Sequence, residues 1–139
     1  MIFPIYVKWE NSMIKILLLS GFGMLGVMCR YLIGAYSGTY FSSPFPTATF
    51  LINLVGSFLI GIIYVSGIEH GKINPVLCLA LMTGFLGGFT TFSAFSLETV
   101  RLLEKGLWTT ACFYVVLSGV LGVGCTWGGV GIARWYLSR

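Results

Sequence analysis

Few side chains in this chain could do chemistry, and three of them stand in or beside long apolar stretches: Arg30, Asn53 and Glu98. Ionisable groups inside a membrane span are costly and usually face the interior of a helix bundle or an aqueous cavity. An arginine there would attract anions, unless it reaches back to a lipid headgroup. The Asn53 amide could donate to an anion or bridge two helices. Glu98 does not suit an anion path unless it is protonated, bonded to hydroxyls or placed at the membrane interface.

The most unusual stretch is 84–98, Gly-Phe-Leu-Gly-Gly-Phe-Thr-Thr-Phe-Ser-Ala-Phe-Ser-Leu-Glu. It lies in the middle of a long apolar region, yet it is rich in glycine and hydroxyl residues. Unpaired backbone in hydrocarbon is costly, so a break in a membrane helix must be buried in protein or line a wet or ionic cavity. The glycine pair 87–88 followed by the threonine pair 90–91 therefore indicates a broken helix at an ion site. The alternative is a straight helix that packs closely through the GxxxG pair Gly84 and Gly88.

Aromatic and hydroxyl side chains follow this stretch. Phe92 and Phe95 are three residues apart and share a helix face if the helix resumes. Ring edges carry partial positive charge and can hold a small anion, although phenylalanine stripes are more often packing. Further hydroxyl donors stand at Ser93, Ser96, Tyr114 and Ser118. Catalysis is not indicated, because the chain has no aspartate and a single histidine, His70, in a polar loop.

The elements that must position these residues are membrane spans. The chain has 139 residues, of which 57% are hydrophobic and 9% charged, whereas soluble domains carry about 25% charged residues. A spanning helix needs about 20 apolar residues. Four such stretches are expected at residues 14–36, 47–68, 75–103 and 107–137. They predict an all-α integral membrane protein with a short tail, residues 1–13, and a single four-helix domain, residues 14–139.

The connectors between the spans are short and hold most of the charge. Residues 37–46 are rich in Ser, Gly and Pro, which favours turns, and residues 69–74 and 104–106 form two further polar connectors. One side of the membrane would collect Lys8, Lys15, Lys72, Arg134 and Arg139, and the other Arg101 and Lys105, or five against three if Arg30 is counted on the second side. This bias leaves both insertion directions open. Basic residues beside spans account for the net charge of +4, so no nucleic acid partner is expected.

Two patterns do not indicate a site. The cysteines Cys29, Cys78, Cys112 and Cys125 lie in apolar segments, without CxxC spacing or nearby histidines, as is typical of packing residues. Residues 21–26 match GxGxxG, but the match follows no strand and lies inside a span, so it does not indicate dinucleotide binding.

Together these residues resemble the CrcB/Fluc family of fluoride channels, four-span proteins that form antiparallel homodimers of dual topology. The resemblance covers residue 14 to the C-terminus, and its most specific part is Gly-Phe-Thr-Thr-Phe-Ser, residues 88–93. The other matching residues are Gly23, Gly26, Arg30 and Tyr31 in the first span, Pro46, Thr49, Asn53, Gly56 and Gly61 in the second, and Tyr114, Ser118 and Gly122 in the fourth. Ala94 stands where a hydroxyl residue is common, which puts one donor near the pore in question.

The resemblance implies passive export of cytoplasmic fluoride across the bacterial inner membrane, which protects the cell from fluoride. The implied partners are fluoride, a second antiparallel copy and the lipid bilayer, and the protein would not be an enzyme. The fluoride path would be lined by Asn53, Phe92 and Phe95, with Ser93, Tyr114 and Ser118 as polar contacts, Glu98 along the same track and Arg30 at the aqueous vestibule. The backbone carbonyls of Gly87 and Thr90 from both copies would bind one structural sodium ion at the dimer interface.

Two other classes of protein stay open. A small multidrug exporter also has four spans, but it needs a carboxylate in its first span, where this chain has Arg30. A membrane assembly factor that transports nothing is compatible with the composition alone.

Overall fold

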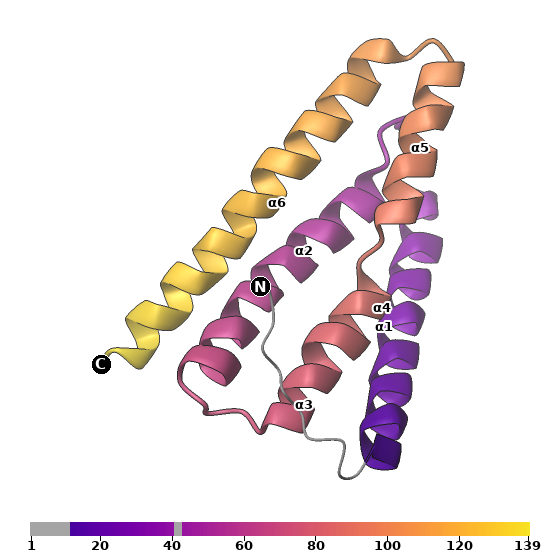
Figure 1. Ribbon diagram of the computed structural model, residues 1–139. Helices are drawn as coiled ribbons and strands as arrows, with labels where there is room; N and C mark the ends of the chain where they lie inside the picture. The colour runs from indigo at the N-terminus through magenta and orange to yellow at the C-terminus, as the bar shows by residue number, and fades with distance from the viewer. Residues whose placement is uncertain (1–11, 41–42) are drawn as a thin grey trace.

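The computed structural model describes residues 12–40 and 43–139, and the regular secondary structure of these residues is helical throughout (Figure 1). The elements are α1 (Ser12–Tyr40), α2 (Thr47–Ile63), η1 (Tyr64–Glu69), α3 (Pro75–Leu79), η2 (Ala80–Leu86), α4 (Gly87–Phe89), α5 (Phe92–Glu104) and α6 (Trp108–Leu137). Four stretches are long and apolar enough to cross a membrane: Ser12–Ser37, Thr47–Glu69, Pro75–Glu104 and Trp108–Leu137. The prediction of an all-helical, four-span membrane protein is confirmed. The predicted tail lies mostly in residues 1–11, outside the described residues.

The first helix continues past its expected end at residue 36. The Ser37 hydroxyl donates to the Gly34 carbonyl at 2.9 Å, so its polar group finds a hydrogen-bond partner within the helix. The first proline after this helix, a residue that does interrupt helices, is Pro44. The connector before α2 is therefore shorter than the composition of residues 37–46 suggested.

The polar loop between the second and third spans forms where it was expected. The Asn74 side chain accepts a hydrogen bond from the Val76 N–H at 2.9 Å, and Pro75 occupies the first turn of α3. An asparagine cap followed by proline is a strong start signal for a helix. Gly71 in this loop and Gly106 before α6 have positive φ angles, 62° and 73°, which glycine adopts without strain.

Glycines allow the spans to approach each other closely. α1 packs along η2 and α4, where a Cβ atom at Gly26 would overlap the Phe85 carbonyl and one at Gly88 would lie 2.5 Å from the Gly23 carbonyl oxygen. α2 packs along α6, as Figure 1 shows, and there a Cβ at Gly61 or Gly129 would overlap the backbone of the facing helix. Small residues at such crossings let helices gain van der Waals contact in lipid.

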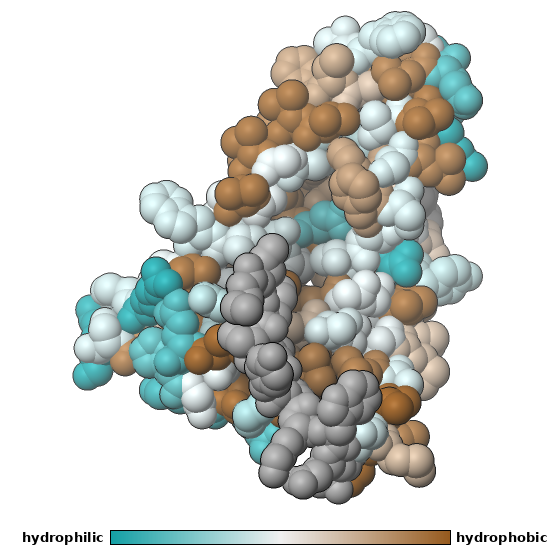
Figure 2. Space-filling model, in the orientation of Figure 1, coloured by the Kyte–Doolittle hydropathy of each residue, from teal (hydrophilic) through white to brown (hydrophobic). Residues whose placement is uncertain are grey.

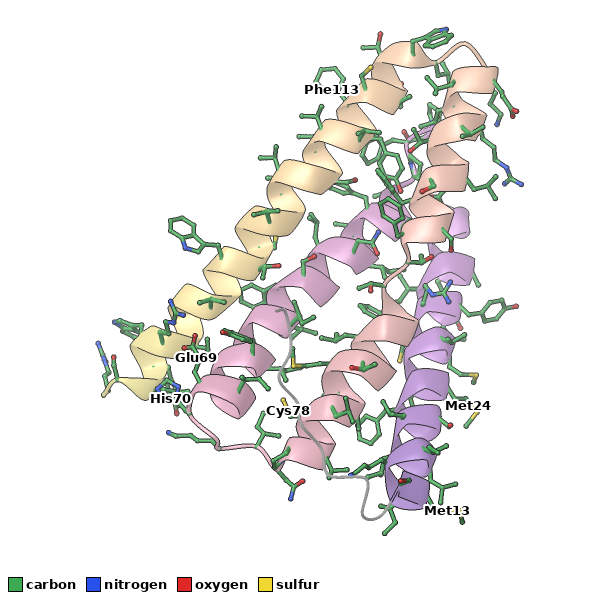
Figure 3. All side chains as sticks on the ribbon, in the orientation of Figure 1. Met13, Met24, Glu69, His70, Cys78 and Phe113 are labelled. Atoms are coloured by element: carbon green, nitrogen blue, oxygen red, sulfur yellow. The ribbon has the colours of Figure 1, made fainter. Side chains whose placement is uncertain are left out.

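Large apolar side chains cover the outside of the molecule. Met13 and Met24 on α1 and Phe113 on α6 point away from the bundle (Figure 3), and each exposes more than half of its surface. On the face seen in Figure 2, strongly hydrophilic residues gather near the C-terminus and beside the α5–α6 turn. An apolar exterior between hydrophilic ends is what a bilayer requires.

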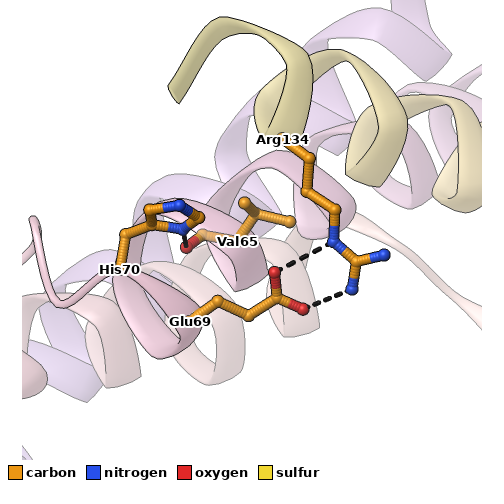
Figure 4. A network of polar contacts seen from close by, with 4 residues as sticks. All are labelled: Val65, Glu69, His70 and Arg134. Carbon is orange, nitrogen blue, oxygen red and sulfur yellow. Dashed lines mark hydrogen bonds and ion pairs between the residues drawn. The ribbon is translucent and has the colours of Figure 1, made fainter. Parts of the chain in front are cut away.

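An ion pair joins η1 to the end of α6 (Figure 4). The Arg134 guanidinium donates to both carboxylate oxygens of Glu69, with Nε at 3.0 Å from Oε2. The neighbouring His70 ring approaches the Val65 carbonyl at 3.2 Å. Because the Glu69–Arg134 pair is exposed, solvent screens it and it contributes little to stability.

The α2–α6 crossing generates the first prediction. Gly129→Ala should lower the thermal unfolding midpoint of the purified protein in detergent, because its Cβ would overlap the Phe58 carbonyl and overpacking costs about 1–3 kcal/mol. Gly128→Ala is the matched control, since a Cβ at Gly128 meets nothing within 4 Å. Equal midpoints for the two variants would contradict this account of the crossing.

Candidate functional site

Two residues between α4 and α5 leave the helical conformation. Thr90 has φ −84° and ψ 156°, and Thr91 has φ −150° and ψ 117°, so both are extended. We call them the extended pair; they lie within the Pro75–Glu104 stretch and appear as the thin link between α4 and α5 in Figure 1. β-Branched side chains favour extended backbone, and glycines just before them weaken the helix. Helix restarts at Phe92, where the Thr91 hydroxyl accepts the Ala94 N–H at 3.2 Å as an N-cap.

Asn53 of α2 pairs with the backbone of Thr91. Its Nδ2 donates to the Thr91 carbonyl at 3.3 Å, and its Oδ1 accepts the Thr91 N–H at 3.0 Å. One amide side chain thus satisfies both backbone groups of a residue that has lost its helical partners. The other N–H of the Asn53 amide is left for a further acceptor, because the amide carries two donors.

Two backbone carbonyls at the extended pair also lose the N–H donors that they would have in a continuous helix. In an α-helix each carbonyl accepts from the N–H four residues later. The Gly87 carbonyl would accept from Thr91, but that N–H donates to Asn53. The Thr90 carbonyl would accept from Ala94, but that N–H donates to the Thr91 hydroxyl. Carbonyl oxygens freed in this way suit a hard cation such as sodium.

Arg30 reaches across from α1 to the end of α4. Its Nε donates to the Gly88 carbonyl at 3.0 Å, and the contact is partly buried. Of the two sequence-based alternatives for Arg30, this direction favours a side chain turned into the bundle over one that reaches for a lipid headgroup.

Two hollows flank the extended pair. The first, which we call the Asn53 hollow, has a volume of about 310 Å³ and is lined by Asn53, Gly56, Ser57, Ile60, Met82, Leu86, Gly87, Thr90, Thr91 and Phe92. The second, the Arg30 hollow, has a volume of about 410 Å³ and is lined by Val27, Arg30, Tyr31, Gly34, Ala35, Ala48, Thr49, Ile52, Thr91 and Ala94. Thr91 lines both hollows, whereas Thr90 lines only the first.

The predicted phenylalanines lie next to each other at the start of α5. The ring centroids of Phe92 and Phe95 are 5.5 Å apart, and Phe92 is 79% exposed. Phe95 also contacts the Tyr114 ring, with centroids 5.0 Å apart. The aromatic row therefore begins at the Asn53 hollow and ends against α6.

Glu98 binds two hydroxyl groups from other helices. Thr49 of α2 and Tyr114 of α6 each donate to one of its carboxylate oxygens at 2.7 Å, and Tyr114 is fully buried. Of the three alternatives considered for Glu98, the structure shows the one with bonds to hydroxyl groups. Thr49 was not predicted as a site residue, because nothing in its sequence surroundings indicates a carboxylate partner 49 residues away.

The remaining predicted residues do not all gather at one point. The Ser93 and Thr91 hydroxyl oxygens are 3.2 Å apart. The Ser118 hydroxyl is buried, and it has no hydrogen-bond partner among the described residues. Ala94 lines the Arg30 hollow, so the hydroxyl expected at this position would stand beside Arg30. Thr91 was named as part of the expected break but not as a site residue, although a threonine directly before a resumed helix is a typical N-cap.

Side chains offer no metal site here: within residues 12–40 and 43–139 no three His, Cys, Asp or Glu side chains lie close enough to hold an ion. A cation near the extended pair would have to be held by backbone oxygen atoms.

Comparison with known proteins agrees with this architecture. Residues 17–130 match the family described as CrcB-like protein, Camphor Resistance (CrcB). A protein of Citrifermentans bemidjiense named fluoride-specific ion channel FluC is 45% identical over 112 residues, which cover 81% of this chain and 90% of that relative. A protein of the same name from Geobacter metallireducens is 42% identical over 122 residues, or 88% and 98% of the two chains. The family match covers most of the chain, and these relatives align over nearly their whole length. The chain therefore belongs to the CrcB-like family.

Proposed function

We propose that this chain forms a fluoride-selective channel that lets cytoplasmic fluoride leave the cell down its electrochemical gradient. The observation that carries the proposal is the extended pair, which lines a hollow together with Asn53 and Phe92 inside a membrane-crossing stretch. Irregular backbone at membrane depth is tolerated only where it is buried in protein or lines a polar cavity. Relatives at 42–45% identity are named fluoride-specific ion channels, which identifies the anion.

The protein is a multi-pass membrane protein of the bacterial inner membrane, and its proposed activity is transport and not catalysis. Fluoride enters a cell as neutral hydrogen fluoride, dissociates in the less acidic cytoplasm and is trapped there as the anion. A passive channel driven by the membrane potential suffices to release it, because the inside-negative potential expels anions. A small multidrug exporter would need a carboxylate in the first span, where this chain has Arg30.

The proposed fluoride path follows the donors that remain free. The Asn53 amide keeps one N–H beyond its bond to Thr91, and the Ser118 hydroxyl is buried without a partner among the described residues. The path would also run along the edges of Phe92 and Phe95, which carry partial positive charge and whose ring centroids are 5.5 Å apart. Ser93, Tyr114 and Glu98 border the same track. Donors fixed in a narrow passage would favour fluoride over the larger chloride.

The functional unit in this proposal is an antiparallel dimer. The Asn53 hollow has an amide, a serine, two threonines and two glycines in its lining, and lipid cannot satisfy the polar groups among them. A second, inverted copy would cover the hollow and the exposed Phe92 ring. The weak bias of basic residues between the two sides allows both insertion directions.

A structural sodium ion would lie where the two copies meet. The residues fit it, because the Gly87 and Thr90 carbonyls have lost their helical donors and Gly87 is exposed in the Asn53 hollow. Carbonyls at an interrupted helix are typical sodium ligands in membrane proteins. The ion would offset the repulsion between these oxygens and hold the extended pair in place.

The function is tested by fluoride flux. The protein in liposomes should pass fluoride and retain chloride, and Asn53→Asp should lower fluoride flux by more than about tenfold, since its carboxylate would face both the Thr91 carbonyl and the anion. The measurement is fluoride efflux with an ion-selective electrode, with gel filtration to show that the variant still assembles.

Asn74→Asp is the matched control for this substitution. Asn74 only accepts a hydrogen bond in its cap of α3, and a carboxylate accepts equally well. Wild-type flux in Asn53→Asp would restrict Asn53 to a structural role, and absence of fluoride flux in the wild-type protein would reject the proposed function.

The dimer is tested by labelling from one side. Single cysteines at Lys105 and at Ser138, which stand at opposite ends of α6, are introduced into a chain whose four native cysteines are replaced. An impermeant maleimide applied outside cells should label part of the population at each position. Lysis should then expose the remainder. Labelling of one position only would show a single orientation and reject the antiparallel dimer.

The sodium site is tested by depletion. Prolonged removal of sodium should lower fluoride flux reversibly, because the bend at Thr90 sets the direction of Phe92 and Phe95 just beyond it. Phe92→Ile and Phe95→Ile should impair flux while sodium stays bound, since the proposed ligands are backbone oxygens. The bound ion is measured by atomic emission before and after depletion. Unchanged flux after verified loss of sodium would contradict the coupling.

A further inference from the structure

The contact between Arg30 and Gly88 joins the first span to the helix end that precedes the extended pair. The Arg30 Nε lies 3.0 Å from the Gly88 carbonyl oxygen, and the contact is partly buried. Gly88 is also pressed against α1, where a Cβ atom would lie 2.5 Å from the Gly23 carbonyl oxygen. Gly88 is thus held against α1 both by the hydrogen bond from Arg30 and by close packing.

Two other carbonyls near this point have partners of their own. The Leu86 carbonyl accepts both the N–H and the hydroxyl of Thr90, at 2.9 and 2.8 Å. The Thr91 carbonyl accepts from Asn53 at 3.3 Å. With the Gly88 carbonyl bound to Arg30, three carbonyls around the proposed cation ligands are held by protein donors.

We propose that Arg30 is a positioning residue for the cation site: its Nε–H holds the Gly88 carbonyl and thereby sets the direction of the Gly87 and Thr90 carbonyls on either side. This rests on the proposed function, which places sodium on those two oxygens. Glycine rotates more freely than other residues, so a Gly88 carbonyl without its donor would turn toward another partner. That rotation would move the chain between the two ligands.

A second role for Arg30 would use its charge and not its Nε–H. The guanidinium lines the Arg30 hollow beside Thr91, where a positive charge would attract anions. Three substitutions separate the two roles. Arg30→Gln places an uncharged N–H donor at the same distance along the side chain as Nε. Arg30→Lys keeps the charge but has a methylene there, and Arg30→Met has neither donor nor charge.

The experiment measures sodium binding without fluoride. Each purified protein is depleted of sodium and titrated with sodium chloride at constant ionic strength, set with N-methylglucamine chloride, while its thermal unfolding midpoint is recorded. A ligand at free concentration c that binds only the folded state raises the free energy of unfolding by RT ln(1 + c/Kd), so the midpoint begins to rise near the dissociation constant and then increases with the logarithm of the concentration. For Arg30→Lys and Arg30→Met, the sodium concentration at which the midpoint begins to rise should be about tenfold higher than for the wild-type protein. For Arg30→Gln it should stay within about twofold of the wild-type value.

Each outcome has a distinct meaning. Absence of any sodium-dependent shift in the wild-type protein would overturn the sodium site itself, and the positioning role with it. A wild-type shift that is equal in all three variants would overturn the positioning role alone. So would a shift preserved in Arg30→Lys and lost in Arg30→Gln, because the charge would then be the decisive property. If Arg30→Met does not fold, the comparison of the Gln and Lys variants still decides.

Discussion

The structure depends on the cost of leaving backbone groups unpaired inside a membrane. Two extended residues in the third span release N–H and carbonyl groups that a continuous helix would pair, and lipid offers them nothing. Asn53 accepts from the Thr91 N–H, and Arg30 donates to the Gly88 carbonyl. The Thr91 hydroxyl accepts from the Ala94 N–H. The polar residues that stand within the spans are thus largely explained by the backbone they satisfy.

This arrangement of partners requires close helix packing, which the glycines permit. Arg30 can donate to Gly88 because α1 approaches the third span through Gly26 and Gly88, where Cβ atoms would meet backbone. In the same way Gly56 leaves room for the Thr90 side chain, which brings α2 and its Asn53 to the extended pair. The hydrogen bonds therefore depend on the glycines, because a larger residue at either crossing would also move a hydrogen-bond donor.

Local patterns predicted the four spans and the start of the third at Pro75, because hydropathy and the preference of proline for a first helical turn depend on neighbouring residues. The Gly-Phe-Thr-Thr-Phe-Ser motif, residues 88–93, also contains the two extended residues themselves. What could not be predicted are contacts set by tertiary packing. Nothing near Thr49 in the sequence indicates its bond to Glu98, and nothing near Arg30 indicates that its partner is a backbone carbonyl.

The bonds to Glu98 bear on where an anion can be held. A hydroxyl carries one hydrogen, and those of Thr49 and Tyr114 are directed to the Glu98 carboxylate at 2.7 Å. While Glu98 is ionised, neither hydroxyl can donate to fluoride without giving up a bond to a charged acceptor, which is among the stronger kinds. The Ser118 hydroxyl has no such competitor among the described residues. In the proposed path, the donor from α6 that is ready to bind an anion would therefore be Ser118, and Tyr114 would contribute mainly by placing Phe95 and Glu98.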